Sequence, residues 1–248
     1  MIQLKSRREI DVMARGGKIL AETVKLMERS VKPGMTTADL DRIADEFIRG
    51  HPGAAPSFKG LYDFPASICT SINNEIVHGI PSKKRVLVEG DVVSIDVGVL
   101  YEGYHTDSAT TVAVGVVSPE SQRLLDVTRE ALDAGVAAAR AGNHLGDIGA
   151  AVQQVVERAG FSVVRDLVGH GIGSGFHEEP QVPNYGKPNR GIRLVPGLTI
   201  AIEPMVNAGK PGIRTMPDRW TVVTVDGERS AHFEHTVAVT ENGPRVLT

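Results

Sequence analysis

The chain has 248 residues, a length that suits either one large α/β domain or two small ones. Hydrophobic residues make up 41% and charged residues 23%, and 27 basic against 30 acidic residues give a formal net charge of -3. This balance argues against intrinsic disorder and a dedicated nucleic-acid binder, and a single cysteine, Cys69, excludes an intramolecular disulfide framework or a cysteine-built zinc or iron–sulfur site.

Two helices and three extended segments are predicted in the first half. Apolar residues at helical spacing predict a helix over residues 6–29, opened by a capping box of Ser6 and Glu9. A second helix is predicted over 37–49, with Gly50 just past its end. Segments rich in Val, Ile and Thr predict strands at about 66–78, 91–99 and 104–117. The order reads ααβββ.

The same order recurs in the second half. Helices are predicted from Ser118 to about Arg140 and from about Gly146 to Arg158, and strands near 162–169, 197–203, 220–225 and 232–240. The second helices of the halves align when residue numbers differ by 108, for example Asp39 with Asp147. Duplication is favoured over chance likeness, so we expect a pseudo-repeat of about 1–117 and 118–248 and a site between the halves. No linker rich in Pro, Gly or Ser separates the halves, so we expect a single domain over 1–248.

Two aspartates stand in strand-like segments of the first half. If the turn is centred between Tyr101 and Glu102, Asp96 lies directly opposite Asp107, with Cβ atoms about 4.5 to 5.5 Å apart. Like charges opposite one another are destabilising, and aspartate is depleted in strand interiors. The pattern therefore predicts a cation between the two carboxylates.

Two glutamates and a histidine extend this set. Glu203 and Glu234 also lie in apolar strand-like segments, where an unpaired carboxylate would cost several kcal/mol. Either could be a hydrogen-bonded structural acid alone, but with the aspartates they suggest metal ligands. His170, in a glycine-rich stretch, completes the set. Four carboxylates and a neutral imidazole would balance two divalent cations, and such a centre activates water for hydrolysis near neutral pH.

The remaining histidines and the aromatic residues are less informative. His78 and His177 lie in loops, where a histidine is more often solvated than functional, and the other five are given no function. The aromatic residues either pack in the core or line a specificity pocket. Those that flank the candidate site are Phe58, Tyr62, Phe64, Phe176 and Trp220.

The five candidate ligands and their flanks resemble type I methionine aminopeptidase, a metallopeptidase of family M24. The motifs are Asp-Val-Gly-Val, His-Thr-Asp-Ser-Ala, Gly-His-Gly-Ile-Gly, Ile-Glu-Pro-Met and Phe-Glu-His-Thr, and the likeness covers essentially the whole chain. The resemblance implies an α+β pita-bread fold. In this fold two pseudo-twofold-related ααβββ-type halves surround a curved antiparallel sheet, with a dinuclear metal centre in the middle.

The resemblance also implies an activity, namely removal of the initiator methionine from nascent chains whose second residue is small. It implies two divalent ions (Co²⁺, Mn²⁺, Fe²⁺ or Zn²⁺) and Glu203 as both ligand and general base. His78 would contact the scissile amide nitrogen and His177 the carbonyl oxygen. The ligands would be Asp96, Asp107, His170, Glu203 and Glu234.

Further residues are implied by the same resemblance. The methionine side chain and scissile bond would lie against Phe58, Leu61, Phe64, Cys69, His78, Phe176, His177 and Trp220. Leu61 departs from the tyrosine of many relatives, and Phe58 stands where some have cysteine. A monovalent cation, Na⁺ or K⁺, would lie near Asn73, Glu75 and Ser230.

Location and partners follow from what the sequence lacks and from the resemblance. We expect neither a membrane span nor a secretory leader, because no run of about 18 apolar residues exists and no apolar stretch follows the basic N-terminal residues. We therefore expect a cytoplasmic monomer that acts on free N-termini of nascent chains, with transient ribosome association and no DNA or membrane partner. Alternatives are an Xaa-Pro aminopeptidase of the same fold and a non-catalytic pita-bread peptide-binding module.

Overall fold

Four helices frame the molecule, which a computed structural model describes over residues 2–248. The predicted capping box is confirmed, because Ser6 Oγ accepts from the Glu9 N–H and the Glu9 carboxylate accepts from the Ser6 N–H. Each helix begins within one residue of its predicted start. The helices are α1 (Arg7–Ser30), α2 (Thr37–Arg49), α3 (Pro119–Ala138) and α4 (Leu145–Arg158).

Short strands fill the space between the helix pairs. The first half contributes β1 (Ala54–Pro56), β2 (Ile68–Ile72), β3 (Glu75–Val77), β4 (Val92–Tyr101) and β5 (Tyr104–Ala113), with a 3₁₀ turn at Leu61–Asp63. The second half contributes β6 (Ser162–Val163), β7 (Gly169–Gly171), β8 (Glu178–Val182), β9 (Thr199–Ile202), β10 (Met205–Asn207), β11 (Ile213–Thr215), β12 (Val222–Thr224), β13 (Ser230–His232), β14 (His235–Thr240) and β15 (Gly243–Val246).

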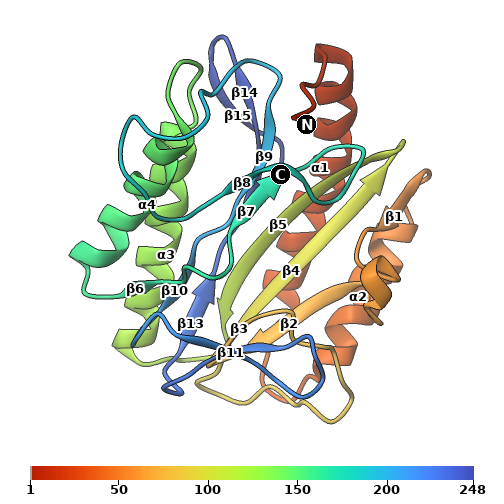
Figure 1. Cartoon of the computed structure of the whole chain (residues 1–248). Coiled ribbons are helices and arrows are strands. Elements are labelled where there is room, and N and C mark those ends of the chain that lie inside the picture. Colours follow the sequence, from red (N-terminus) through yellow and green to blue (C-terminus); the bar gives the residue numbers. More distant parts are fainter. Residues whose placement is uncertain (1) are drawn as a thin grey trace.

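The two larger sheets are antiparallel. One has the order β1-β4-β2 with β5 beside β4, and the other has the order β15-β14-β9-β7-β8. Figure 1 shows α1 and α2 at one flank, α3 and α4 at the opposite flank, and the strands between them. The strands therefore form a layer that both helix pairs enclose. The two halves meet where β5 lies beside β13 and β14.

Each helix pair buries its own apolar core. Leu20 and Leu40 pack with residues of β2 and β4, whereas Leu132 and Ile148 pack with residues of β9 and β14. Removing these side chains from water is the main favourable term in folding. Among residues 2–248, no helix combines the length and apolar character needed to cross a membrane.

The register of the central hairpin differs from the prediction. Asp107 lies opposite Gly98, and Asp96 lies opposite Ala109. The cause is the turn, which is centred between Glu102 and Gly103 rather than one position earlier, with φ of +47° and +85°. Such a two-residue turn with two positive φ angles matches the twist of a hairpin. The partner of each residue changes by two, so both aspartates stay on one face.

Several strands are shorter than predicted or were missed. The segment 66–78 is broken between β2 and β3, where Asn73 has a φ of +57°. The segment 162–169 yields β6 and the start of β7, which belong to different sheets. β8 lies outside the predicted strands. It tolerates Pro180 as the edge strand of its sheet, where a missing N–H breaks no ladder.

The second helices of the two halves begin alike. The Thr36 N–H donates to the Asp39 carboxylate at 3.1 Å, and the His144 N–H donates to the Asp147 carboxylate at 2.6 Å. These pairs occupy positions 108 apart, which is the spacing that the aligned sequences predict. The likeness supports internal duplication, and both the duplication and a single catalytic domain stay predictions.

Candidate active site

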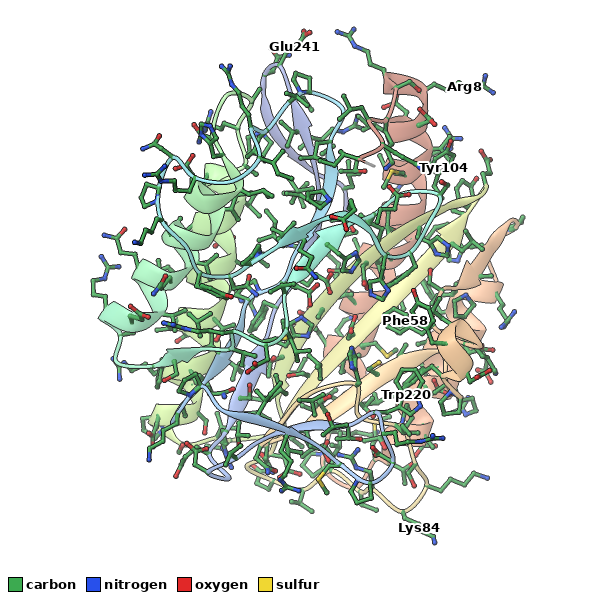
Figure 2. The ribbon with its side chains drawn as sticks, in the orientation of Figure 1. Arg8, Phe58, Lys84, Tyr104, Trp220 and Glu241 are labelled. Carbon is green, nitrogen blue, oxygen red and sulfur yellow. The ribbon has the colours of Figure 1, made fainter. Side chains whose placement is uncertain are left out.

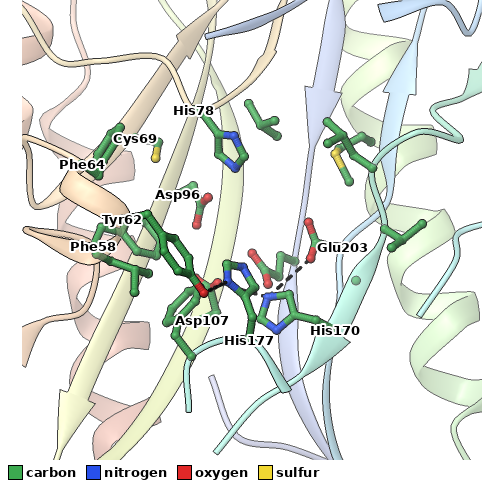
Figure 3. Close-up of a pocket in the computed structure, with 18 of the residues that line it drawn as sticks. Phe58, Tyr62, Phe64, Cys69, His78, Asp96, Asp107, His170, His177 and Glu203 are labelled. Carbon is green, nitrogen blue, oxygen red and sulfur yellow. Dashed lines mark hydrogen bonds and ion pairs between the residues drawn. The ribbon is translucent and has the colours of Figure 1, made fainter. Parts of the chain in front are cut away.

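A cavity of about 540 Å³ opens between the two halves. It brings together residues from both, although they lie far apart in the sequence (Figure 3). Every predicted divalent-metal and substrate residue lines it, namely Phe58, Leu61, Phe64, Cys69, His78, Asp96, Asp107, His170, Phe176, His177, Glu203, Trp220 and Glu234.

Hydrogen bonds between the halves bring the acids together. Asp96 and Asp107 lie on β4 and β5, and Glu234 stands between β13 and β14. The Glu234 N–H donates to the carbonyl of Ala109 at 3.0 Å, and Ser108 Oγ donates to the carbonyl of Glu234 at 2.8 Å. These bonds join β5 to the second half directly beside the carboxylates.

The ring of His170 turns its Nε2 atom toward the acids. Its Nδ1 lies 2.8 Å from the carbonyl of Gly171, which can only accept, so Nδ1 carries the proton. Nε2 then presents its lone pair 3.9 Å from Asp107 Oδ2 and 3.7 Å from Glu203 Oε1. Ligand atoms of Asp107, His170 and Glu234 all lie within 4.8 Å of one another, which suits a single metal ion.

Burial dominates the electrostatics of this cluster. It raises the pKa of Asp96 to about 7. Burial, followed by the charges of neighbouring carboxylates, raises the pKa values of Asp107, Glu203 and Glu234 well above their usual range. Burial also lowers the pKa of His170 to about 4, so its imidazole is neutral at pH 7. Crowded buried acids with a neutral imidazole are the electrostatic pattern expected of a cation site.

The polar atoms of the cluster fit divalent metal ions. Asp96 Oδ1 and Glu234 Oε1 are buried without any hydrogen-bond partner. An unpaired buried carboxylate oxygen is costly, and a cation would satisfy it. Carboxylate oxygens with one imidazole nitrogen suit several transition-metal ions.

Two further histidines flank the cluster. Burial lowers the pKa of His78 to about 4 and lowers that of His177. The ring of His177 lies 4.4 Å from that of His170, measured between centroids. On its other side, Tyr62 Oη lies 3.3 Å from His177 Nδ1 and the two rings stack (Figure 3). Both histidines are therefore neutral at pH 7 and can donate a hydrogen bond into the cavity.

One end of the cavity is an aromatic pocket. The ring of Phe58 makes edge contacts with Phe64 at 6.5 Å and with Phe176 at 5.4 Å, between centroids. Trp220 makes a similar contact with Phe64 at 5.0 Å. Figure 2 shows Phe58 and Trp220 within the outline of the molecule, whereas Lys84 projects from its lower edge. Such edge-to-face packing favours a fixed pocket shape.

The three residues predicted near a monovalent cation lie outside the cavity lining. The Ser230 N–H donates to the carbonyl of Asn73 at 2.9 Å. The Glu75 carboxylate forms an ion pair with Arg85 and accepts from the Ile72 N–H. The Glu75 carboxylate thus already has two protein partners. The monovalent-cation site stays a prediction, in which backbone carbonyls would bind the cation.

His232, for which no function was predicted, lies beside the cluster. It is 1% exposed, and neither ring nitrogen has a hydrogen-bond partner. Its Nε2 is 3.8 Å from Glu203 Oε2 and 4.0 Å from Glu234 Oε2. Its place beside the cluster could have been predicted from its spacing of two residues from Glu234, because residues two apart along an extended chain share a face.

Comparison with known proteins identifies the family of this chain. Residues 11–241 match the metallopeptidase family M24. A methionine aminopeptidase of Clostridium perfringens is 54% identical over 248 residues, which cover 100% of this chain and 99% of that protein. The crystal structure of a methionine aminopeptidase from Thermotoga maritima matches with a TM-score of 0.98 and 43% identity, covering 100% of this chain and 99% of that one.

A more distant structure also shows the fold. The prolidase of Pyrococcus horikoshii matches with a TM-score of 0.79 at 22% identity, and this chain covers 63% of its length. The match includes 99% of this chain, so the predicted pita-bread architecture is confirmed. By the family match and by identity over the full length, the chain belongs to metallopeptidase family M24, among its methionine aminopeptidases.

Proposed function

We propose that this protein removes N-terminal methionine from peptides and nascent chains whose second residue is small. The observation that carries the proposal is the meeting, in one cavity, of a buried carboxylate–histidine cluster with an aromatic pocket. The first can hold metal ions for hydrolysis, and the second offers an apolar surface to an unbranched thioether side chain. The relatives named methionine aminopeptidase support the same substrate.

Two divalent ions, each Co²⁺, Mn²⁺, Fe²⁺ or Zn²⁺, would be held by the five clustered side chains. When bound, the ions lower the pKa of a coordinated water and polarise the scissile carbonyl. The histidine contributes its Nε2, since Nδ1 is committed to a backbone carbonyl. The proposed ligands are Asp96, Asp107, His170, Glu203 and Glu234.

Protein side chains would handle the protons of the reaction. Glu203 would take a proton from the attacking water and pass it toward the leaving amine. His177 would donate to the carbonyl oxygen as negative charge develops there, and His78 would contact the scissile nitrogen. Both histidines are neutral at pH 7 because burial lowers their pKa values, so each keeps one N–H for donation.

The aromatic pocket would recognise the methionine. Sulfur contacts with ring edges are favourable, and the edge-to-face rings of Phe58, Phe64 and Trp220 supply such edges. Leu61 and Cys69 would complete the apolar lining.

We also propose that the protein is a cytoplasmic monomer that contacts the ribosome transiently. A monovalent cation would lie near Ser230.

The proposed function is tested by release of free methionine. The protein is stripped with a chelator, Mn²⁺ or Co²⁺ is restored, and three peptides are compared, namely Met-Ala-Ser, N-formyl-Met-Ala-Ser and an Ala-Pro peptide. Metal-dependent cleavage of the first alone is expected. Cleavage only before proline would assign an Xaa-Pro aminopeptidase, and metal binding without any cleavage would favour a peptide-binding module.

A further inference from the structure

The loop that carries His177 is held in shape by a hydrogen bond to the side chain of the next residue, Glu178. This loop connects β7 to β8, and Glu178 is the first residue of β8, opposite Gly171. The Glu178 Oε1 atom accepts from the N–H of Gly175 at 2.9 Å. The carboxylate thereby connects the start of β8 to Gly175 in the middle of the loop, and His177 lies between these two connected residues.

Lys5 holds the second oxygen of the same carboxylate. Its Nζ forms an ion pair with Glu178 Oε2, and the side chains are 4% and 10% exposed. Nζ also donates to the carbonyl of Gln3 at 3.0 Å. The N-terminal segment is itself fixed, since the Lys5 N–H donates to the carbonyl of Gly197 at 2.7 Å.

Gly173 makes this contact possible. A Cβ at Gly173 would overlap Lys5 Cε and would lie 2.8 Å from Glu178 Oε1, so a side chain there would displace the end of the Lys5 side chain. The carbonyl of Gly173 accepts from the His105 N–H at 2.7 Å, which joins the loop to β5. The loop is therefore fixed on one side by β5 and on the other by Lys5.

Two side chains of the active site depend on this loop. The ring of Phe176 lies 5.4 Å from that of Phe58 and 5.5 Å from that of His170, between centroids. The ring of His177 contacts both Phe176 and His170. A shift of the loop would therefore move the proposed carbonyl donor and one wall of the pocket together.

We propose that Lys5 and Glu178 are positioning residues, a buried ion pair that fixes the loop so that His177 faces the substrate carbonyl. The inference rests on the proposed role of His177. Replacing a buried ion pair by apolar side chains is often neutral or favourable for stability, so fold stability alone gives little reason for the pair. Its effect lies in the placement of His177, because a displacement of about 1 Å from a productive geometry can cost about 100-fold in rate.

Two variants test the pair, and two further variants serve for comparison. Lys5→Met keeps the apolar stem and removes the charge, and Glu178→Gln keeps an acceptor for the Gly175 N–H. The matched control is Arg15→Met, which removes the exposed ion pair between Arg15 and Glu102, whose side chains are 54% and 51% exposed. His177→Ala is measured in parallel to test the role on which the inference rests.

Activity, hydrogen exchange of the loop amides and metal binding are measured on each variant. We expect Lys5→Met and Glu178→Gln to lower kcat by about 10- to 100-fold with KM within about threefold. Hydrogen exchange at the Gly175 amide should become faster, while exchange in β4 and the affinity for Mn²⁺ by calorimetry stay unchanged. Arg15→Met should match the wild type in all three measurements.

Several outcomes would overturn the positioning role. One is unchanged kcat in both variants, whether or not Gly175 exchanges faster. Another is a fall in kcat that tracks weaker Mn²⁺ binding or faster exchange in β4, which would indicate general loss of structure. If Lys5→Met fails to fold, Glu178→Gln carries the test alone. An inactive wild type or an unaffected His177→Ala would instead refute the proposed function or the role of His177.

Discussion

Asp107 lies directly opposite Gly98 across the β4–β5 hairpin, and the absence of a side chain at Gly98 leaves room for the aromatic pocket. A Cβ at Gly98 would lie 2.8 Å from Phe58 Cε1 and 3.1 Å from Phe176 Cε2. Asp96 and Asp107 are diagonal neighbours on the same face. The strand pair thus places a proposed metal ligand, Asp107, beside a wall of the proposed methionine pocket.

Gly98→Ala should impair methionine recognition. Overpacking of a well-packed site typically costs about 1 to 3 kcal/mol in free energy of unfolding, and here the displaced atoms belong to Phe58, Phe176 and the neighbouring Ser57. We expect a lower thermal midpoint and a KM for Met-Ala-Ser raised by about tenfold, with Mn²⁺ still bound. The control is Gly186→Ala, where an added Cβ meets no atom closer than 3.5 Å. An unchanged KM would show that the pocket does not depend on this glycine.

Glu203→Gln should cut turnover by at least about two orders of magnitude, because an amide cannot accept the proton from the attacking water. Glutamine keeps the size of the side chain and one carbonyl oxygen for a metal ion. Turnover is measured together with metal content, so that loss of a base is separated from loss of a ligand. Near-wild-type turnover with full metal content would remove the proposed role of base.

The sequence predicted those features that depend on local chemistry. The four helices were found because their apolar spacing and caps, such as Ser6 with Glu9, lie within a few residues. The acids were found because a carboxylate in an apolar strand, such as Glu203, is costly without a partner. The hairpin register was wrong because it depends on which two residues adopt positive φ, and Glu102 is an unusual choice.

Features that depend on tertiary contacts were not predictable. His232 has no distinctive motif, and its place beside Glu203 arises from the pairing of β10 with β13, in which it lies opposite Met205. The pairing of Lys5 with Glu178 joins residues 173 positions apart. Lys5 and Glu178 leave no periodic or compositional signal in one sequence, because each is ordinary in its own segment. For His232 the signal is its spacing of two residues from Glu234, which does not by itself indicate that it lies beside Glu203.

Tyr62→Phe should lower kcat modestly without changing KM. The hydroxyl of Tyr62 lies 3.3 Å from His177 Nδ1, and its donation there would leave the imidazole proton on Nε2. Phenylalanine keeps the stacked ring and loses the hydroxyl. One hydrogen bond contributes about 1 kcal/mol, which corresponds to about a fivefold effect on kcat.

Ring ¹⁵N shifts of His177 test the cause directly. We expect them to report the Nε2-protonated tautomer in the wild type and a mixture in Tyr62→Phe. The control is Tyr185→Phe, because the ring of Tyr185 packs beneath Arg165 outside the cavity lining. Identical ring shifts in wild type and Tyr62→Phe would contradict the assignment of the tautomer to the hydroxyl.

Thermal stabilisation by metal should increase with pH. In the metal-free protein, burial raises the pKa of Asp96 from 3.8 to about 7 and raises those of the other three acids. The folded state therefore binds more protons than the unfolded state, so stability is present below about pH 4 and is lost as the pH rises through about 7. Metal ions replace these protons and remove the repulsion, so their effect is largest where the acids would be charged.

The measurement is the thermal midpoint with and without Mn²⁺ between pH 6 and pH 8. The gain in midpoint on adding Mn²⁺ should be larger at pH 8 than at pH 6. His170 contributes little to this slope, since its pKa of about 4 leaves it neutral throughout the range. Asp96→Asn removes a proposed ligand that is also one of the acids whose protons compete with metal, so it should reduce both the gain and its pH dependence. A gain that is equal at both pH values, or larger at pH 6, would show that protons and metal ions do not compete for these carboxylates.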